Sequence, residues 1–109
     1  MDGHFECEIG DSAPGEPLTV TVRGDVDLAT APDLEAKVRE AFAKSPSSVV
    51  IDLAALSFID SSGLRALVAV SNEARSRDLA IALRSVPRHA QRVLEMTGLA
   101  DWFDRDGSA

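Results

Sequence analysis

The amino-acid sequence predicts an α/β domain in which a mixed central β-sheet of four to five strands packs with about three to four helices. From residue 18 onward, short apolar stretches typical of strands alternate with longer stretches whose apolar residues recur at helical spacing. Before that point, two strand-like stretches flank a loop, which predicts an N-terminal hairpin and therefore a sheet that is not wholly parallel. The 109 residues suit one domain, 1–109, with a core spanning about 5–104.

Alternating apolar and polar residues predict two half-buried strands at the N-terminus. The apolar positions are Phe5, Cys7 and Ile9 in the first strand and Leu18, Val20 and Val22 in the second. The segment between them, GDSAPGEP at residues 10–17, is typical of a turn or loop. Because Cys7 shares one strand face with apolar neighbours, we expect a buried core thiol in preference to a reactive one.

Two further strands are predicted in the middle of the sheet. Residues 49–53, VVIDL, and residues 79–83, LAIAL, are almost continuously apolar. Such runs are expected in strands that are covered on both faces, as in parallel sheets. A short last strand is predicted around Trp102 and Phe103.

Three helices connect these strands. The first is predicted over residues 31–44, where Thr30 and Asp33 resemble a capping box with Asp in the Glu position. The second is predicted over residues 62–76, after Ser61. The third covers residues 86–97; the residues expected to delimit it are Ser85 as its cap, Gly98 as a left-handed end and Leu99 packing back.

Composition excludes several classes of function. Lys and Arg total 11 against 18 Asp and Glu, a net charge of -7, which argues against binding to nucleic acid or to anionic membranes. No apolar run approaches the roughly 18 residues of a membrane span. The single cysteine cannot form an internal disulfide, and no Cys or His spacing suggests a metal site. We therefore expect a cytoplasmic protein without metal or cofactor.

The stretch SFIDSSGL, residues 57–64, places an acid and two hydroxyls where a buried strand ends and a helix starts. One serine, Ser61 or Ser62, is explained as a helix cap, and Gly63 allows a tight turn. This explanation does not account for Asp60 or for the second serine. A free hydroxyl at the positive end of a helix is suited to receive a phosphoryl group, because the helix dipole favours the added charge.

Enzyme chemistry has little support in the sequence. A catalytic set of Ser61, His89 and an Asp can be imagined, but DSSG lacks the Gly-x-Ser-x-Gly elbow. No phosphate-binding loop or dinucleotide fingerprint is present. We expect a binding protein that is not an enzyme.

Four motifs resemble those of one family, in order along the chain. They are VRGDVDLATAPDL at 22–34, VVIDL at 49–53, LSFIDSSGLRAL at 56–67 and VLEMTGL at 93–99. Together they are similar to the STAS family, specifically the bacterial anti-sigma factor antagonists. The resemblance spans nearly the whole chain and implies a single STAS domain.

The resemblance implies a switch set by phosphorylation of Ser61. In the family, the anti-sigma factor is itself a serine kinase of the GHKL type and modifies the first serine of the pair. The unmodified antagonist binds the anti-sigma factor and frees the sigma factor, whereas the phosphorylated antagonist dissociates from the anti-sigma factor. The implied partner-binding residues in this sequence are Asp25, Asp27, Asp60, Ser61, Ser62, Gly63 and Arg65.

Some features depart from the family pattern. Arg65 stands where several relatives place a small residue, so a long cation can steer partner choice or pair with the phosphate. Asp25 stands for a Glu, and the chain stops soon after Phe103, where many relatives continue into a helix. We expect a monomer or weak dimer. The alternative is a STAS scaffold or ligand-sensing module without a kinase partner.

Overall fold

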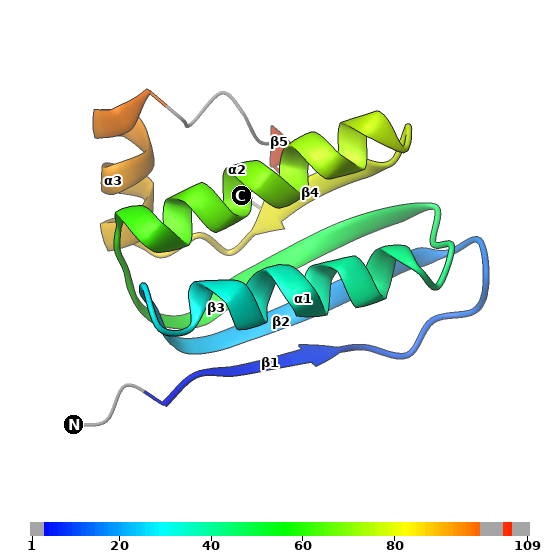
Figure 1. Ribbon diagram of the computed structural model, residues 1–109, viewed down its shortest axis with the longest axis horizontal. Coiled ribbons are helices and arrows are strands. Elements are labelled where there is room, and N and C mark those ends of the chain that lie inside the picture. Colours follow the sequence, from blue (N-terminus) through cyan, green and yellow to red (C-terminus); the bar gives the residue numbers. More distant parts are fainter. Residues whose placement is uncertain (1–3, 99–103, 106–109) are drawn as a thin grey trace.

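The computed structural model describes residues 4–98 and 104–105, which form one five-stranded sheet and three helices (Figure 1). The elements are β1 (Glu6–Ile9), β2 (Pro17–Val26), α1 (Ala31–Phe42), β3 (Ser48–Ile59), α2 (Ser61–Ser76), β4 (Ala80–Arg84), α3 (Arg88–Thr97) and β5 (Asp104–Arg105). The strand order is β1-β2-β3-β4-β5. β1 pairs antiparallel with β2, and the other pairs are parallel. The predicted mixed sheet with its N-terminal hairpin is confirmed.

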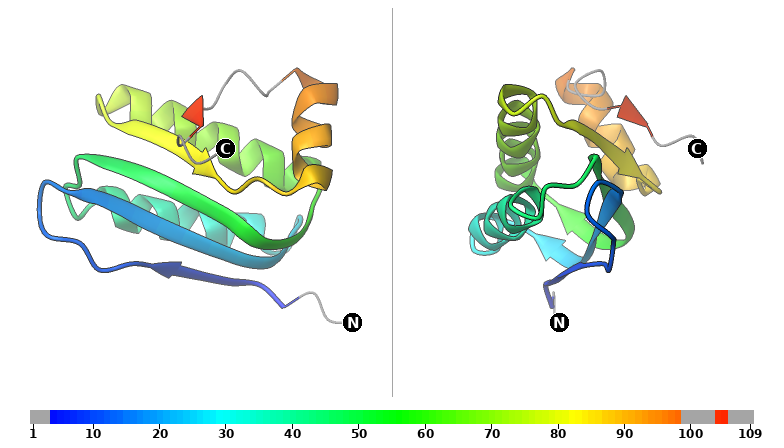
Figure 2. Two further views of the ribbon diagram at one scale, coloured as in Figure 1. Left: turned by 180° about the vertical axis from the view of Figure 1, so that it is seen from behind. Right: turned by 90° about the vertical axis from the view of Figure 1, so that its right-hand side faces the viewer.

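Helices α1 and α2 lie side by side on one face of the sheet, and the core lies between the two layers (Figure 1). In the view from behind, the strands face the reader and both helices lie behind them (Figure 2). Burial along β3 follows this arrangement, since Val49, Ile51 and Leu53 are buried while Val50 and Asp52 are only half-buried. The prediction that the central strands are covered on both faces is therefore wrong. The alternation of buried and half-buried residues could not be seen in the sequence because Val50, on the less buried face, is also apolar.

The parallel strands β2 and β3 bend at their carboxyl ends. The pairing register shifts between Thr21 and Arg23 and again between Gly24 and Asp25, as expected of β-bulges. Gly24 has a φ of 87°, and a Cβ atom at this position would overlap the carbonyl group of His4 in the segment before β1. Only glycine fits a backbone approach this close. The bulges place Val26 opposite Ile59, and both side chains are buried.

The ends of α1 and α3 differ from the sequence prediction. Helix α1 ends at Phe42, and Ser45 then takes a left-handed conformation with a φ of 55°. Helix α3 starts at Arg88, so Ser85, which has a φ of 56°, lies in the preceding turn and does not cap the helix. Gly98 ends α3 with a φ of 75°, which confirms the predicted left-handed cap. The predictions for residues 99 and 102–103 lie outside the described residues.

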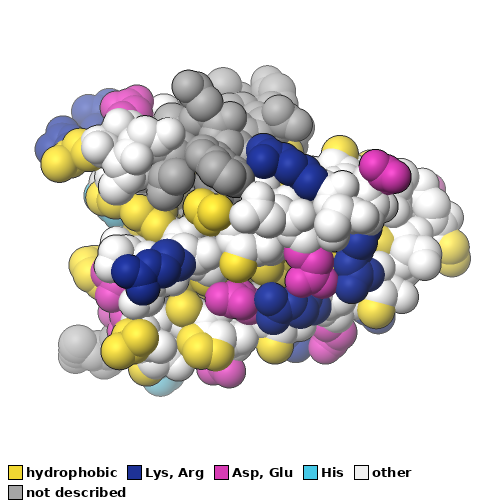
Figure 3. All heavy atoms as spheres, turned by 45° about the horizontal axis from the view of Figure 1, so that its top comes forward, with side chains coloured by type: hydrophobic (Ala, Val, Ile, Leu, Met, Phe, Trp, Pro, Cys, Tyr) yellow, Lys and Arg dark blue, Asp and Glu magenta, His cyan; other side chains and the backbone are white. Residues whose placement is uncertain are grey.

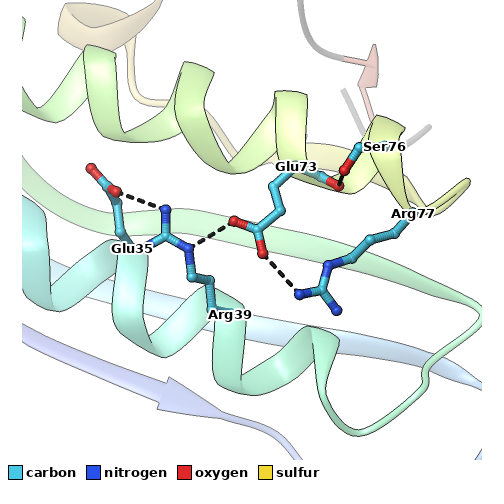
Figure 4. Close-up of polar contacts among 5 residues, drawn as sticks. All are labelled: Glu35, Arg39, Glu73, Ser76 and Arg77. Atoms are coloured by element: carbon cyan, nitrogen blue, oxygen red, sulfur yellow. Dashed lines mark hydrogen bonds and ion pairs between the residues drawn. The ribbon is translucent and has the colours of Figure 1, made fainter.

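Ion pairs join α1 to α2 on the outer surface of the helix layer, where acidic and basic side chains are interspersed (Figure 3). Glu73 of α2 lies between two guanidinium groups, 2.7 Å from Nε of Arg39 and 3.0 Å from Arg77 (Figure 4). Arg39 also contacts Glu35 at 3.1 Å. The hydrogen bond from Arg39 lowers the pKa of Glu73. None of the helices within residues 4–98 is long and apolar enough to cross a membrane.

Candidate functional site

The carboxyl ends of β2 and β3 bring the predicted acidic residues to one edge of the sheet. Asp25 lies opposite Phe58 in the strand register, and the backbone N–H of Asp60 donates to the carbonyl oxygen of Val26 at 3.2 Å. Asp27 follows β2 directly, as Asp60 follows β3. The start of α2 and helix α3 lie at this same end of the domain (Figure 1). Parallel strands in α/β domains present their ligand sites at this edge.

Asp60 caps helix α2. Its carboxylate oxygen Oδ1 accepts hydrogen bonds from the backbone N–H groups of Ser62, at 2.8 Å, and of Gly63, at 3.1 Å. Its backbone is extended, with φ −112° and ψ −169°, as is usual for a residue at this position. The prediction that Ser61 or Ser62 supplies the cap is therefore wrong. The helix begins one residue earlier than predicted, which moves the capping position from serine to aspartate.

The aspartate cap leaves both serine hydroxyls available. Ser61 is the first residue of α2 and is exposed, while Ser62 is half-buried. Within the described residues, neither hydroxyl has a hydrogen-bond partner. The acid and the serine of the motif thus differ in role. Asp60 caps the helix, whereas the Ser61 hydroxyl is exposed and bonds to no described residue.

Gly63 allows α2 to approach the strand ends closely. It is buried, and a Cβ atom placed on it would lie 2.6 Å from Cγ1 of Ile59 and 2.9 Å from the carbonyl oxygen of Val26. Gly63 lies in the first turn of the helix and its φ is not positive. Its predicted role as a residue that permits a tight turn is therefore wrong, because packing against β2 and β3 is what requires a glycine.

The junction between β2 and α1 uses its acid and its hydroxyl together. Oδ1 of Asp27 accepts from the N–H groups of Ala29, at 3.0 Å, and Thr30, at 3.2 Å. The Thr30 hydroxyl accepts from the N–H of Asp27 and donates to the carbonyl oxygen of Asp25, both at 2.9 Å. Thr30 makes no side-chain cap on α1, so the predicted capping box with Asp33 does not form.

Exposed apolar side chains flank the site, and the sequence analysis missed them as a group. Among the described residues, the large hydrophobic side chains that are exposed are Leu28 at 79%, Phe58 at 49% and Met96 at 79%. Leu28 follows Asp27, and Phe58 precedes Asp60 by two positions. Met96 is next to Thr97, which shares a hollow with Ser61. The sequence did contain a signal for Phe58. Neighbouring residues of a strand face opposite sides, so a buried Ile59 implies that Phe58 points away from the core.

A hollow of about 340 Å³ lies beside Ser61 between α2 and the end of α3. Its described lining consists of Ser61, Leu64, Arg65, Val68 and Thr97. Arg65 is exposed and takes part in no ion pair with another described residue. The spacing of Ser61 and Arg65, one helical turn apart, could have indicated this shared surface from the sequence.

Other chemically interesting residues do not join the site. Nε2 of the exposed His89 lies 3.4 Å from the carbonyl oxygen of Leu56, and the Ser61 hydroxyl has no hydrogen bond to it. Cys7 lies in the N-terminal strand, where burial raises the pKa of its thiol to about 11. Such a thiol is almost wholly protonated near neutral pH, which agrees with the predicted unreactive role. No group of three potential metal ligands occurs in the described part of the chain.

Comparison with known proteins assigns this chain to a family. The STAS domain profile matches residues 9–107. Anti-sigma-F factor antagonist RsfB of Mycobacterium tuberculosis is 41% identical over 54 residues, which cover 50% of this chain and 44% of RsfB. The anti-sigma-B factor antagonist of Listeria monocytogenes is 30% identical over 84 residues, covering 77% of this chain and 74% of that protein. The matched segment thus spans less than half of RsfB.

A solved structure shows the same architecture over most of the chain. The crystal structure of an anti-sigma factor antagonist from Mycobacterium paratuberculosis superposes with a TM-score of 0.77 and 28% identity, covering 94% of this chain and 86% of that one. The chain therefore belongs to the STAS domain family, and the relatives described here are anti-sigma factor antagonists. The resemblance seen in the four sequence motifs is confirmed.

Proposed function

We propose that this protein is an anti-sigma factor antagonist that binds an anti-sigma factor through the edge containing Ser61 and thereby frees a sigma factor. The observation that carries the proposal is the exposed hydroxyl of Ser61, which bonds to no described residue and lies beside an aspartate that caps the helix. The names of the relatives supply the class of partner. The role is regulatory binding, and the protein performs no catalysis itself.

The proposed docking face combines charge with apolar surface. Asp25, Asp27 and Asp60 gather at the edge, and a basic partner surface would complement them. Leu28 and Phe58 offer exposed apolar area beside these acids, and such patches commonly mark interaction sites. Ser62, Gly63 and Arg65 complete the face along the first turns of α2.

Phosphorylation of Ser61 by the anti-sigma factor is the proposed off switch. The Ser61 oxygen forms a bond to the γ-phosphorus of ATP held by that kinase, the bond from this phosphorus to the β,γ-bridging oxygen breaks, and ADP leaves. The hydroxyl proton passes to a base of the kinase. The new group adds a charge of about −1.5 to −2 at the centre of the docking face.

The phosphate weakens binding through bulk, desolvation and repulsion from acids on the partner. A loss of about 3 kcal/mol would reduce the affinity more than a hundredfold. Because Ser61 is exposed and its hydroxyl bonds to no described residue, we expect the modification to leave the backbone nearly unchanged. A chemical-shift change spread over the whole sheet on phosphorylation would contradict this.

Phosphorylation in vitro tests the proposal. The protein would be incubated with candidate anti-sigma kinases and ATP, and the modified peptide would be mapped by mass spectrometry. We expect one phosphate on Ser61, retained in Ser62→Ala and absent in Ser61→Ala. If no candidate kinase modifies Ser61, the scaffold or ligand-sensing alternative takes the place of the switch.

A further inference from the structure

We propose that Arg65 binds the phosphate of phosphorylated Ser61 within the same chain, so that modification also withdraws a cation from the docking face. The inference deepens the proposed function and rests on it only in taking Ser61 as the modified residue. Three observations support it. Ser61 and Arg65 share one face of α2, Arg65 forms no ion pair with a described residue, and the first amides of the helix already bind Asp60.

The two residues are placed to meet. Ser61 and Arg65 stand at positions i and i+4 of α2, which puts their Cβ atoms about 5–6 Å apart on one helix face. Side chains of a helix lean toward its N-terminus, so the long Arg65 side chain extends in the direction of Ser61. Both residues line the same hollow of about 340 Å³. A phosphate on Ser61 therefore lies within reach of the guanidinium group.

Arg65 is available for this contact. Two other arginines of the helix layer, Arg39 and Arg77, are paired with Glu73. Arg65 pairs with no acidic side chain among the described residues and is exposed. The other described residues that line the hollow are Leu64, Val68 and Thr97, which carry no charge. No described residue that lines the hollow therefore competes with a phosphate for the guanidinium group.

Helix α2 has fewer free backbone N–H groups for a phosphate than an uncapped helix N-terminus would have. Such termini bind anions through free backbone N–H groups. In α2, the N–H groups of Ser62 and Gly63 already donate to Oδ1 of Asp60. A phosphate on Ser61 would lie beside this carboxylate, so a cation is needed to offset the repulsion. Arginine suits the task because its fork of donors matches phosphate oxygens.

The contact would enlarge the effect of modification on binding. In the unmodified protein, Arg65 is an exposed cation on the proposed docking face, free to contact an acidic group of the partner. In the phosphorylated protein, the same side chain is held by the phosphate. The partner then meets an added negative charge and loses a positive one through a single modification.

A titration of the phosphate tests the contact without any kinase. Phosphoserine would be installed at position 61 by codon suppression, and its pKa near 6 would be followed by ³¹P NMR in the native sequence and in Arg65→Gln. Because a paired cation favours the dianion, we expect Arg65→Gln to raise this pKa by about 0.4. The matched control is Arg75→Gln, which removes one cation from the same helix 14 positions away and should leave the pKa unchanged.

The outcomes separate the inference from the proposed function. Equal phosphate pKa values in the native sequence and Arg65→Gln would overturn the contact, as would an equal rise in the Arg75→Gln control. Either result leaves phosphorylation of Ser61 by a kinase untouched. Conversely, a raised pKa in Arg65→Gln alone supports the contact even if no anti-sigma kinase modifies the chain.

Discussion

The two strand-to-helix junctions of this domain use the same residue types in different ways. At both junctions an aspartate follows the strand and holds two backbone N–H groups with one carboxylate oxygen, Asp27 before α1 and Asp60 before α2. The hydroxyl near each aspartate differs. Thr30 is engaged on both sides, by Asp27 N–H and the Asp25 carbonyl oxygen, whereas Ser61 is engaged by nothing in the described residues.

The difference separates a hydroxyl that is hydrogen-bonded within the fold from one that bonds to no described residue. A hydroxyl that already donates and accepts within the fold cannot be modified without breaking the loop that it holds. A hydroxyl beside a completed cap can be modified without removing a hydrogen bond of the junction. The comparison therefore favours Ser61 over Thr30 as the proposed site of modification.

The largest expected effect on stability comes from the close approach of α2 to the strand ends. Gly63→Ala places a Cβ atom against Ile59 and the carbonyl oxygen of Val26, and we expect it to lower the free energy of unfolding by about 2–3 kcal/mol. Urea denaturation measures this. Gly10→Ala is the matched control, because its Cβ atom would meet nothing closer than 3.4 Å. A Gly63→Ala protein as stable as the control would show that the junction is loosely packed.

Removing the Thr30 hydroxyl should destabilise the protein, whereas removing the Ser61 hydroxyl should have little effect. Thr30→Val leaves the Asp27 N–H and the Asp25 carbonyl oxygen without their partner, and should cost about 1–2 kcal/mol of unfolding free energy. Ser61→Ala should change it by less than about 0.5 kcal/mol. Thermal or urea unfolding of both variants gives the comparison directly. Equal destabilisation by the two changes would contradict the distinction between the junctions.

The aspartate cap of α2 can be tested in the same way. Asp60→Ala removes the acceptor for two N–H groups and should cost about 1 kcal/mol. Asp60→Asn keeps a side-chain oxygen at the cap and should retain most of the stability. If Asp60→Ala leaves the free energy of unfolding unchanged while Ser62→Ala lowers it, the helix is capped by serine and this assignment is wrong.

A smaller effect is expected in the ion pairs between α1 and α2. Glu73→Gln should lower the free energy of unfolding by about 0.5 kcal/mol at neutral pH, since the partners are partly exposed. The pKa of Glu73 is lower in the folded protein than in the unfolded chain, chiefly through Arg39. Its contribution is therefore complete above the unfolded pKa and disappears as the pH falls through the folded one. A native-to-variant difference that persists in acid would contradict this assignment.

Much of the fold follows from periodicity in the sequence. The alternation at Leu18, Val20 and Val22 predicts β2, and helical spacing predicts α1 and α2 closely. Once the strands are known to be parallel neighbours, Asp25, Asp27 and Asp60 must meet at one edge. The gathering of these acids is therefore a consequence of topology alone.

Details that depend on one residue of register could not be predicted. Aspartate and serine are comparable as helix caps, so a shift of the helix start by one position decides between Asp60 and Ser61. The hollow beside Ser61 depends on how Thr97 of α3 packs against α2, which local sequence patterns do not encode. The proposed role of Ser61 as phosphoacceptor rests on family resemblance. The structure adds that its hydroxyl is exposed and bonds to no described residue.

Affinity for the anti-sigma factor is the most direct test of the central claim, that Ser61 is dispensable to the fold yet controls docking. The measurement is isothermal titration of the native protein, Ser61→Ala and Ser61→Asp with the same anti-sigma factor. We expect Ser61→Ala to bind within about threefold of the native protein and Ser61→Asp to bind more than about a hundredfold more weakly. A Ser61→Asp protein that binds as tightly as the native one would contradict the account.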